Sequence, residues 1–258
     1  MRILVTNDDG IHSEGLISLE RALAQVGEVY TVAPANEMSG ASHSLTLSRP
    51  LRIRKQGERR WSVDGTPTDC VALGLYQILK EELKPDICVS GINYGANLGD
   101  DVSYSGTVAG ALEATIMGVP GIALSLATRE HFDFTYAARF AAMVTAKAVR
   151  EGLPEGTLLN INIPPGEIKG VRVTLQGVKH ARTVIHEQID PRGRPYYWIG
   201  EQYFTAEAAQ GSDYHAVEDG FVSVTPIRAD MTHHRVLAAL EHWNDIEVDA
   251  AQPQSIPQ

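Results

Sequence analysis

Short apolar runs alternate with helical patterns from residue 1 to about residue 165, and this alternation constrains the fold more than any other feature. The runs Arg2–Thr6 and Val29–Ala33 have the length and composition of buried strands. Between them, Glu14–Val26 places its leucines on one stripe of a helix, and Gly27 can cap its end. Strands and helices that alternate in this way form a parallel sheet covered by helices. The sequence therefore predicts an α/β core over residues 1–165.

The remaining elements of this core follow the same two patterns. Thr66 is a good N-cap, Pro67 fits the first position of a helix, and Asp69 suits its positive end. We expect further helices over Pro67–Leu83, Val108–Met117 and Thr135–Glu151, and further strands over Ile87–Ser90, Gly121–Leu126 and Leu158–Ile163.

After Pro164 the pattern becomes rich in strands. The segment Asp190–Gly193 has the composition of a turn and its flanks have that of strands, so we predict a projecting hairpin over about 186–200. We therefore divide the chain into a core, 1–165, and a β-rich C-terminal extension, 166–258, that packs on the core. Other strands of the extension are expected at Val171–Leu175 and Phe221–Pro226.

The composition is that of a globular protein with its own apolar core, since 43% of the residues are hydrophobic and 21% are charged. The formal net charge of -10 argues against long nucleic acid as a partner, but small phosphate esters stay open because a bound divalent cation reverses the local field. The two cysteines, Cys70 and Cys88, lie in apolar stretches, as is typical of a reducing compartment. Because no signal-peptide pattern and no apolar run of about 20 residues is present, we expect a cytoplasmic protein without membrane contact.

Three polar or glycine-rich loops follow strands of the predicted sheet, namely Thr6–Gly10, Pro34–Ser44 and Ser90–Asp101. In open parallel sheets, ligands bind beyond the carboxyl ends of the strands. We expect the three loops to open on the same edge of the sheet, and this edge is the candidate functional site.

Asp8 and Asp9 are the sharpest candidates in these loops. Two adjacent carboxylates beyond a buried strand repel each other unless a positive charge lies beside them, and a hard divalent cation with oxygen ligands would supply that charge. Asp-Asp-Gly also makes a simple turn, and the motif alone favours neither interpretation. The other two loops favour the metal site. Ser39 and Asn93 are neutral oxygen donors, either as metal ligands or as groups that stabilise their own loops.

Other residues at this edge are suited to an anion. Asn97 and the glycine-rich segment Gly91–Gly99 offer amide and backbone N–H groups. The segment Ser105–Thr107 precedes an expected helix, and backbone N–H groups at a helix N-terminus attract phosphate, although plain N-capping explains these residues equally well. His43 could act as an acid or as an outer group, or it could simply be exposed in its loop. The sequence contains neither a Walker A lysine nor an HExxH pair. It also lacks a G-x-S-x-G elbow, which disfavours a serine hydrolase.

In combination, these motifs resemble those of the SurE (survival protein E) family of 5'/3'-nucleotidases. The resemblance spans about residues 1–228, and its motifs are specific together although each one alone is not. It rests on Met1–Gly10, Val32–Pro34 with Ser39 and Gly40, Gly65–Cys70, Ser90–Asn93 with Gly95 and Asn97, Ser105–Thr107, Asp190–Gly193, Tyr197–Gly200 and Gly220–Pro226.

The resemblance implies a Rossmann-like core and one divalent metal ion, Mg²⁺ or Mn²⁺. It implies hydrolysis of nucleoside 5'- and 3'-monophosphates to nucleoside and phosphate, and some members of the family also trim short polyphosphate. The metal ligands of the family fall on Asp8, Asp9, Ser39 and Asn93, which are all of the expected type. Members form homodimers or homotetramers, often by exchange of C-terminal segments, which would give the hairpin 186–200 a role in oligomerisation.

Our hypothesis for the reaction is direct attack of a metal-activated water on phosphorus. Asp8 and Asp9 would be the catalytic residues that hold the metal, and one of them could accept a proton. A covalent aspartyl-phosphate is less favoured, because the Asp-x-Asp spacing that is typical of it is missing. The expected substrate-binding residues are Asn97, His43, Ser105, Gly106 and Thr107.

Two other functions stay open at the level of the sequence. A nucleotide-sugar glycosyltransferase could also use a metal and a Rossmann-like sheet, but it should leave simple monophosphates intact. A non-catalytic nucleotide-binding module would bind nucleotide without turnover. The sequence predicts neither a base preference nor a choice between 5' and 3' phosphates, and it leaves both dimer and tetramer open.

Overall fold

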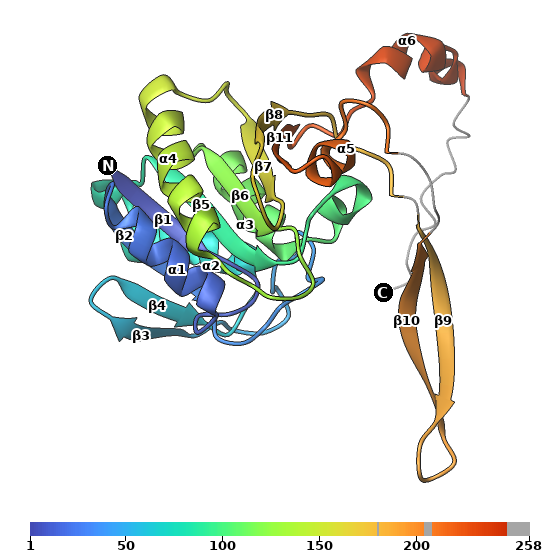
Figure 1. Cartoon of the computed structure of the whole chain (residues 1–258), viewed down its shortest axis with the longest axis horizontal. Coiled ribbons are helices and arrows are strands. Elements are labelled where there is room, and N and C mark those ends of the chain that lie inside the picture. The colour runs from blue at the N-terminus through green and yellow to red at the C-terminus, as the bar shows by residue number, and fades with distance from the viewer. Residues whose placement is uncertain (180, 204–207, 247–258) are drawn as a thin grey trace, which may run out of the picture.

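The computed structural model describes residues 1–179, 181–203 and 208–246 (Figure 1). Its centre is a nine-stranded sheet with the strand order β3-β4-β2-β1-β5-β6-β7-β11-β8. Five neighbouring strands, from β2 to β7 in this order, run parallel to one another. This sheet confirms the predicted α/β fold. The five parallel strands are β2 (Glu28–Pro34), β1 (Arg2–Thr6), β5 (Ile87–Tyr94), β6 (Gly121–Leu126) and β7 (Thr157–Ile163).

Helices cover both faces of this sheet. α1 (Glu14–Leu23) and α4 (Thr135–Glu151) lie side by side on one face (Figure 1). α2 (Pro67–Leu73) and α3 (Gly106–Ile116) pack together on the other. The observed bounds of α4 are those expected from its periodicity. The expected helix over 67–83 is interrupted, because a π-helical segment, Gly74–Leu79, and a short 3-10 turn follow α2.

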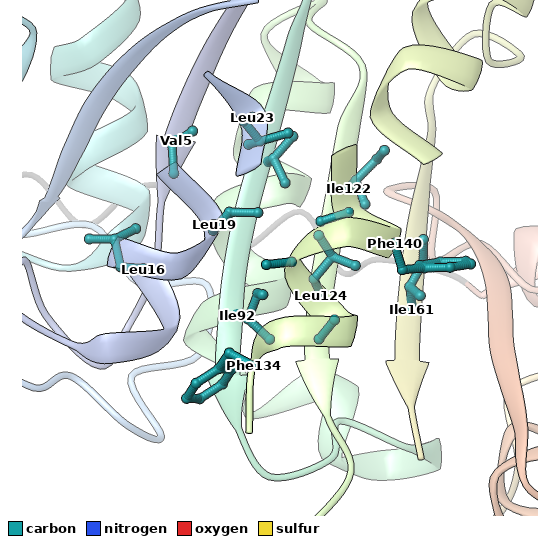
Figure 2. Packing of buried hydrophobic residues seen from close by; sticks show 14 of the residues in the cluster. Val5, Leu16, Leu19, Leu23, Ile92, Ile122, Leu124, Phe134, Phe140 and Ile161 are labelled. Atoms are coloured by element: carbon teal, nitrogen blue, oxygen red, sulfur yellow. The ribbon is translucent and has the colours of Figure 1, made fainter. Parts of the chain in front are cut away.

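Successive side chains of β1 point to opposite faces of the sheet, which explains why helices can pack on both faces. Ile3 and Val5 belong to the apolar cluster under α1 and α4, while Leu4 belongs to the cluster under α2. Figure 2 shows Leu16, Leu19 and Leu23 of α1 in the first cluster, and none of these three side chains is exposed to solvent. Burial of a leucine contributes roughly 1.5 to 3 kcal/mol, so this stripe fixes α1 on the sheet.

Two strands at one edge of the sheet were not expected. β3 (Ile53–Gly57) and β4 (Arg60–Val63) form an antiparallel hairpin, and β4 extends the sheet parallel to β2. The charged residues of this hairpin conceal any alternation of apolar side chains, and such charges are typical of an edge strand that avoids pairing with other chains.

The sheet continues beyond the predicted core boundary at residue 165. β11 (Phe221–Arg228) pairs antiparallel with β7, and β8 (Gly170–Val173) pairs parallel with β11. The short helix α5 (Asp213–Glu218) precedes β11 and packs against it. The division into 1–165 and 166–258 stays a prediction, and residues 247–258 of the extension lie outside the described residues.

The predicted hairpin is confirmed and has longer arms than expected. β9 (Ala181–Ile189) and β10 (Pro195–Tyr203) form a separate antiparallel sheet that projects from the body of the protein (Figure 1). The turn between them contains Asp190, which accepts hydrogen bonds from the backbone N–H groups of Arg192 and Arg194. Toward the C-terminus, the described chain ends in the short helix α6 (Leu237–Leu240) between two 3-10 turns. In the described ranges, no helix is both long and apolar enough to cross a membrane.

Candidate active site

The strand order reverses between β1 and β5. β2 lies on one side of β1, whereas β5 and the strands after it lie on the other side. At such a reversal the connections leave in opposite directions, and a crevice forms beyond the carboxyl ends of the two strands. Asp8 and Asp9 follow the end of β1, and Asn93 lies at the end of β5. The topology therefore brings the first and third of the predicted loops to one crevice.

Asp8 lies at the N-terminus of α3. Its carboxylate accepts hydrogen bonds from the Thr107 hydroxyl and from the backbone N–H groups of Gly106 and Thr107. Gly106 is required here, because a Cβ atom at this position would lie 2.8 Å from the Cβ of Asp8. Burial raises the pKa of Asp8, although these hydrogen bonds act in the opposite direction. Gly106 and Thr107, which we predicted to hold phosphate, thus donate hydrogen bonds to a carboxylate of the protein itself.

The pKa of Asp9 is raised as well. Burial and then the charge of Asp8 raise its pKa to about 7, while the backbone N–H of Tyr94 lowers it. One of its oxygens, Oδ2, is buried and has no hydrogen-bond partner among the described residues. Neither Asp8 nor Asp9 forms an ion pair with a basic side chain anywhere in the described part of the chain. The site therefore lacks the positive charge that two adjacent carboxylates require.

The second predicted loop reaches the same crevice. The backbone N–H of Met38 donates to the backbone carbonyl of Asp8 at 2.7 Å, so the loop that carries Ser39 is attached directly to the first loop. The Ser39 hydroxyl is exposed and donates to Glu37 at 2.9 Å. Glu37 is a third carboxylate whose charge acts on Asp9 and raises its pKa, and the sequence argument did not identify it.

The donor set fits a hard divalent cation. The Asn93 side chain donates from Nδ2 to the carbonyl of Gly95 at 2.9 Å, which leaves its amide oxygen as the acceptor for a ligand. Together with Asp8, Asp9 and Ser39, it would give an all-oxygen shell of the kind that Mg²⁺ and Mn²⁺ prefer. Within the described ranges, no three His, Cys, Asp or Glu side chains group as a metal site, so a softer metal with nitrogen or sulfur ligands is not indicated.

Asn97 is nearly buried, which the sequence did not predict. The side chains of Asn160 and Asn162 on β7 donate to its backbone carbonyl at 2.8 Å and 3.0 Å, and Asn162 also accepts from its backbone N–H at 2.8 Å. Its own Nδ2 donates to Ser125 at 2.8 Å. Asn97 is only 7% exposed, so little of its side chain is available for the predicted contact with phosphate. The signal for this clamp was the pair of asparagines two residues apart in an otherwise apolar strand.

The two remaining predicted substrate-binding residues, Ser105 and His43, both contact α3. The Ser105 hydroxyl caps the helix by accepting from the backbone N–H of Val108 at 3.1 Å, as the capping interpretation predicts. His43 bonds through Nε2 to Glu113 at 2.7 Å, roughly two helical turns beyond Ser105. Glu113 is nearly buried and was not identified from the sequence. His43 is thus held against the side of α3 rather than against Asp8.

Comparison with known proteins identifies close relatives along nearly the whole chain. A family model described as "Survival protein SurE" matches residues 3–183. The chain is 50% identical over 247 residues to the "5'-nucleotidase SurE" of Geotalea daltonii, with 94% of this chain and 99% of that protein covered. It is 46% identical over 246 residues to the protein of the same name from Aquifex aeolicus, at 94% and 98% coverage. The crystal structure of the SurE protein from Aquifex aeolicus matches with a TM-score of 0.86 and 45% identity, covering 95% of this chain and all (100%) of that one. These relatives give no support to a glycosyltransferase or to a binding module without turnover.

Proposed function

The chain belongs to the survival protein SurE family, and from this premise we propose that it is a phosphatase that hydrolyses nucleoside 5'-monophosphates with the help of a divalent metal ion. The observation that carries the proposal is the pair of buried Asp8 and half-buried Asp9 at the strand-order reversal, whose pKa values are both raised and which has no basic partner among the described residues. Two ionised carboxylates repel a dianionic phosphate, and a cation between them and the phosphate would remove this repulsion.

We propose Asp8, Asp9, Ser39 and Asn93 as the residues that would hold this ion. When bound, the ion would neutralise the charge of the phosphate and make water a better nucleophile at neutral pH. Burial and the charge of Asp8 raise the pKa of Asp9 to about 7, which suits a group that holds or moves a proton near neutral pH. Asp8 is fixed by three donors from α3, so we assign it the role of orienting the site.

The phosphate would lie between these carboxylates and the start of α3. The helix N-terminus carries a partial positive charge and favours an anion next to it. Gly106 and Thr107 already donate to Asp8, so we propose that they act on the substrate mainly through that carboxylate. Ser105 and Asn97 would contribute hydrogen bonds from their nearly buried positions, and His43 would contact the substrate only from the flank of α3.

We also propose that the protein hydrolyses nucleoside 3'-monophosphates and short polyphosphate. The candidate ligands address only the phosphate group, and they contain no feature that distinguishes the two positions on the ribose. We therefore expect both monophosphates to be substrates, in the presence of either Mg²⁺ or Mn²⁺.

We further propose that the protein acts as a homodimer or homotetramer through the hairpin of β9 and β10. An isolated two-stranded hairpin is marginal in water. This one exposes Trp198 at 65% and Ile199 at 79%, side chains that are usually covered in an assembled protein. The mass in solution before and after replacement of Trp198 by serine would test this role.

The proposed reaction is tested by phosphate release from 5'- and 3'-nucleoside monophosphates, with EDTA, Mg²⁺ or Mn²⁺. We expect release that requires the metal and that does not need a nucleotide sugar. Consumption of a nucleotide sugar while the monophosphates stay intact would instead identify a transferase, and binding without any release under either metal would contradict the proposal.

A further inference from the structure

A cavity of about 580 Å³ opens beside the proposed metal site. Its wall includes Tyr94 and Gly95, and each of these is bonded to a candidate metal ligand. The backbone N–H of Tyr94 donates to Asp9, and the carbonyl of Gly95 accepts from Asn93 at 2.9 Å. The cavity therefore begins where the phosphate site ends, and its volume is in the range of pockets that bind small organic ligands, about 300 to 1,000 Å³.

Aromatic rings from three separate segments line this cavity, namely Tyr94, Phe132 and Tyr214. Phe132 packs edge-to-face on Tyr94, with 4.8 Å between the ring centroids and 80° between the planes. Tyr214 is held by its hydroxyl, which donates to the carbonyl of Leu98 at 3.3 Å. Polar and charged groups complete the wall, at Asp101, Thr128 and Arg129.

A second cavity, of about 460 Å³, is lined by His43 and Ser105 together with residues of α3. It also adjoins the proposed phosphate site, so it is the alternative place for the rest of the substrate. Among the described residues that line it, none is Phe, Tyr or Trp, and Val108, Leu112 and Met231 supply its apolar wall. Bases bind proteins largely by stacking on aromatic rings, which favours the first cavity over the second.

Building on the proposed function, we propose that the cavity lined by Tyr94, Phe132 and Tyr214 binds the base of the nucleotide and that Phe132 is a specificity-determining residue. Tyr94 also fixes Asp9 through its backbone, whereas Phe132 contacts none of the candidate metal ligands in the described hydrogen bonds and ring contacts. Stacking accepts any base, because every base has an aromatic face. The inference therefore predicts a strong preference for nucleotides over phosphate esters without a base, and only a weak choice among bases.

The test compares two phosphomonoesters, adenosine 5'-monophosphate and ribose 5-phosphate, in which the anomeric carbon of the sugar carries the base or a hydroxyl group. We measure kcat/KM for both with the wild type, Phe132→Leu and two controls. Tyr136→Leu replaces an exposed aromatic side chain of α4 that lines neither cavity, and Met231→Ala changes the second cavity. We expect the wild type to prefer the nucleotide, and we expect Phe132→Leu to reduce this preference by about 10-fold or more through KM. Both controls should keep the wild-type preference.

The outcomes separate this inference from the proposed function. If the wild type hydrolyses nucleotides but prefers them no more than ribose 5-phosphate, or if Phe132→Leu keeps the preference, the base does not lie on Phe132. A loss of preference in Met231→Ala alone would place the base in the second cavity and overturn the inference. If the wild type releases no phosphate from any nucleotide, the proposed function itself fails, and this inference fails with it.

Discussion

Asn162 holds Asn97 by both of its backbone polar groups, since its Oδ1 accepts from the Asn97 N–H at 2.8 Å and its Nδ2 donates to the Asn97 carbonyl at 3.0 Å. The two residues are 65 positions apart in the chain. This pairing ties the glycine-rich loop after β5 to strand β7 of the main sheet. The position of this loop, which follows the candidate ligand Asn93 at the end of β5, thus depends on a side chain that touches neither metal nor substrate in our proposal.

Replacement of Asn162 by alanine should impair catalysis. The Asn97 N–H loses its partner, and an unsatisfied buried group costs about 1 to 3 kcal/mol, so the loop should shift to find another. We expect kcat/KM for a nucleoside monophosphate to fall about 10-fold or more, because small displacements of positioning groups reduce rates strongly. Ser223→Ala is the matched control, since Ser223 pairs with Asn162 in the sheet, is equally buried and has no recorded partner for its hydroxyl in the described residues. Equal activity of the two variants would contradict the role of the pairing.

Thr107→Val should weaken metal binding. The substitution keeps the shape of the side chain but removes the hydroxyl that donates to Asp8. Because that hydrogen bond lowers the pKa of Asp8, its loss should favour the protonated carboxyl and disfavour a cation. Loss of a group that orients a ligand typically reduces metal affinity by about 10- to 100-fold, which calorimetry with Mn²⁺ would detect. Thr115→Val removes a hydroxyl from the same helix without touching Asp8, and it should bind Mn²⁺ as the wild type does.

Gly106→Ala should abolish activity although the helix itself would tolerate alanine. The new Cβ would lie 2.8 Å from the Cβ of Asp8 and 2.9 Å from its Oδ2, so Asp8 must move. We expect a fall in kcat/KM of about 100-fold or more, as for a displaced reacting group. Gly57→Ala, where the new atom would meet nothing closer than 3.5 Å, is the control. Wild-type rates in Gly106→Ala would show that the contact with Asp8 does not matter.

Metal affinity should depend on pH through Asp9. Its pKa in the metal-free protein is raised from 3.8 to about 7, so below about pH 7 a proton must leave before the carboxylate can bind a cation. The affinity for Mn²⁺ should therefore fall by up to about 10-fold for each pH unit below that value and level off above it. In Asp9→Asn this dependence should flatten. An unchanged slope in the variant would assign the titration to another group.

The same shift has a consequence for the stability of the metal-free protein. Between about pH 4 and about pH 7 the folded chain retains a proton on Asp9 that the unfolded chain has lost. The folded state therefore binds more protons, and the contribution of this group to the free energy of unfolding falls as pH rises through this window. Unfolding of the metal-free wild type and of Asp9→Asn at both ends of the window would measure that contribution.

Much of the sheet could be predicted because its strands are buried on both faces. β1 and β6 read as continuous apolar runs, and α4 has a helical stripe long enough to fix both ends. The three polar loops were predicted to share one edge, since the carboxyl ends of parallel strands meet there. The strand order then joins the first and third loops at the reversal between β1 and β5, and the Met38 bond joins the second.

What could not be predicted depends on contacts between distant segments. The charged strands β3 and β4 carry no clear alternation, and α5 has six residues, too few for a helical pattern. The partner of His43 is a glutamate 70 positions away, and the pocket of aromatic rings combines three segments that lie far apart in the sequence. A single sequence gives the type of such residues but not their pairing, because the pairing is set by packing of the whole domain.

The central claim is that Asp8 and Asp9 hold a divalent cation that nucleotide hydrolysis requires. The most direct measurement is phosphate release from adenosine 5'-monophosphate by the wild type, Asp8→Asn and Glu155→Gln, each with EDTA, Mg²⁺ or Mn²⁺. Asp8→Asn keeps the size of the side chain and removes its charge, while Glu155 is an exposed acid far along the chain from the site. We predict release by the wild type and Glu155→Gln only with metal, and a loss of about 100-fold or more in Asp8→Asn. Release that survives EDTA, or that persists in Asp8→Asn at the wild-type rate, would contradict the account.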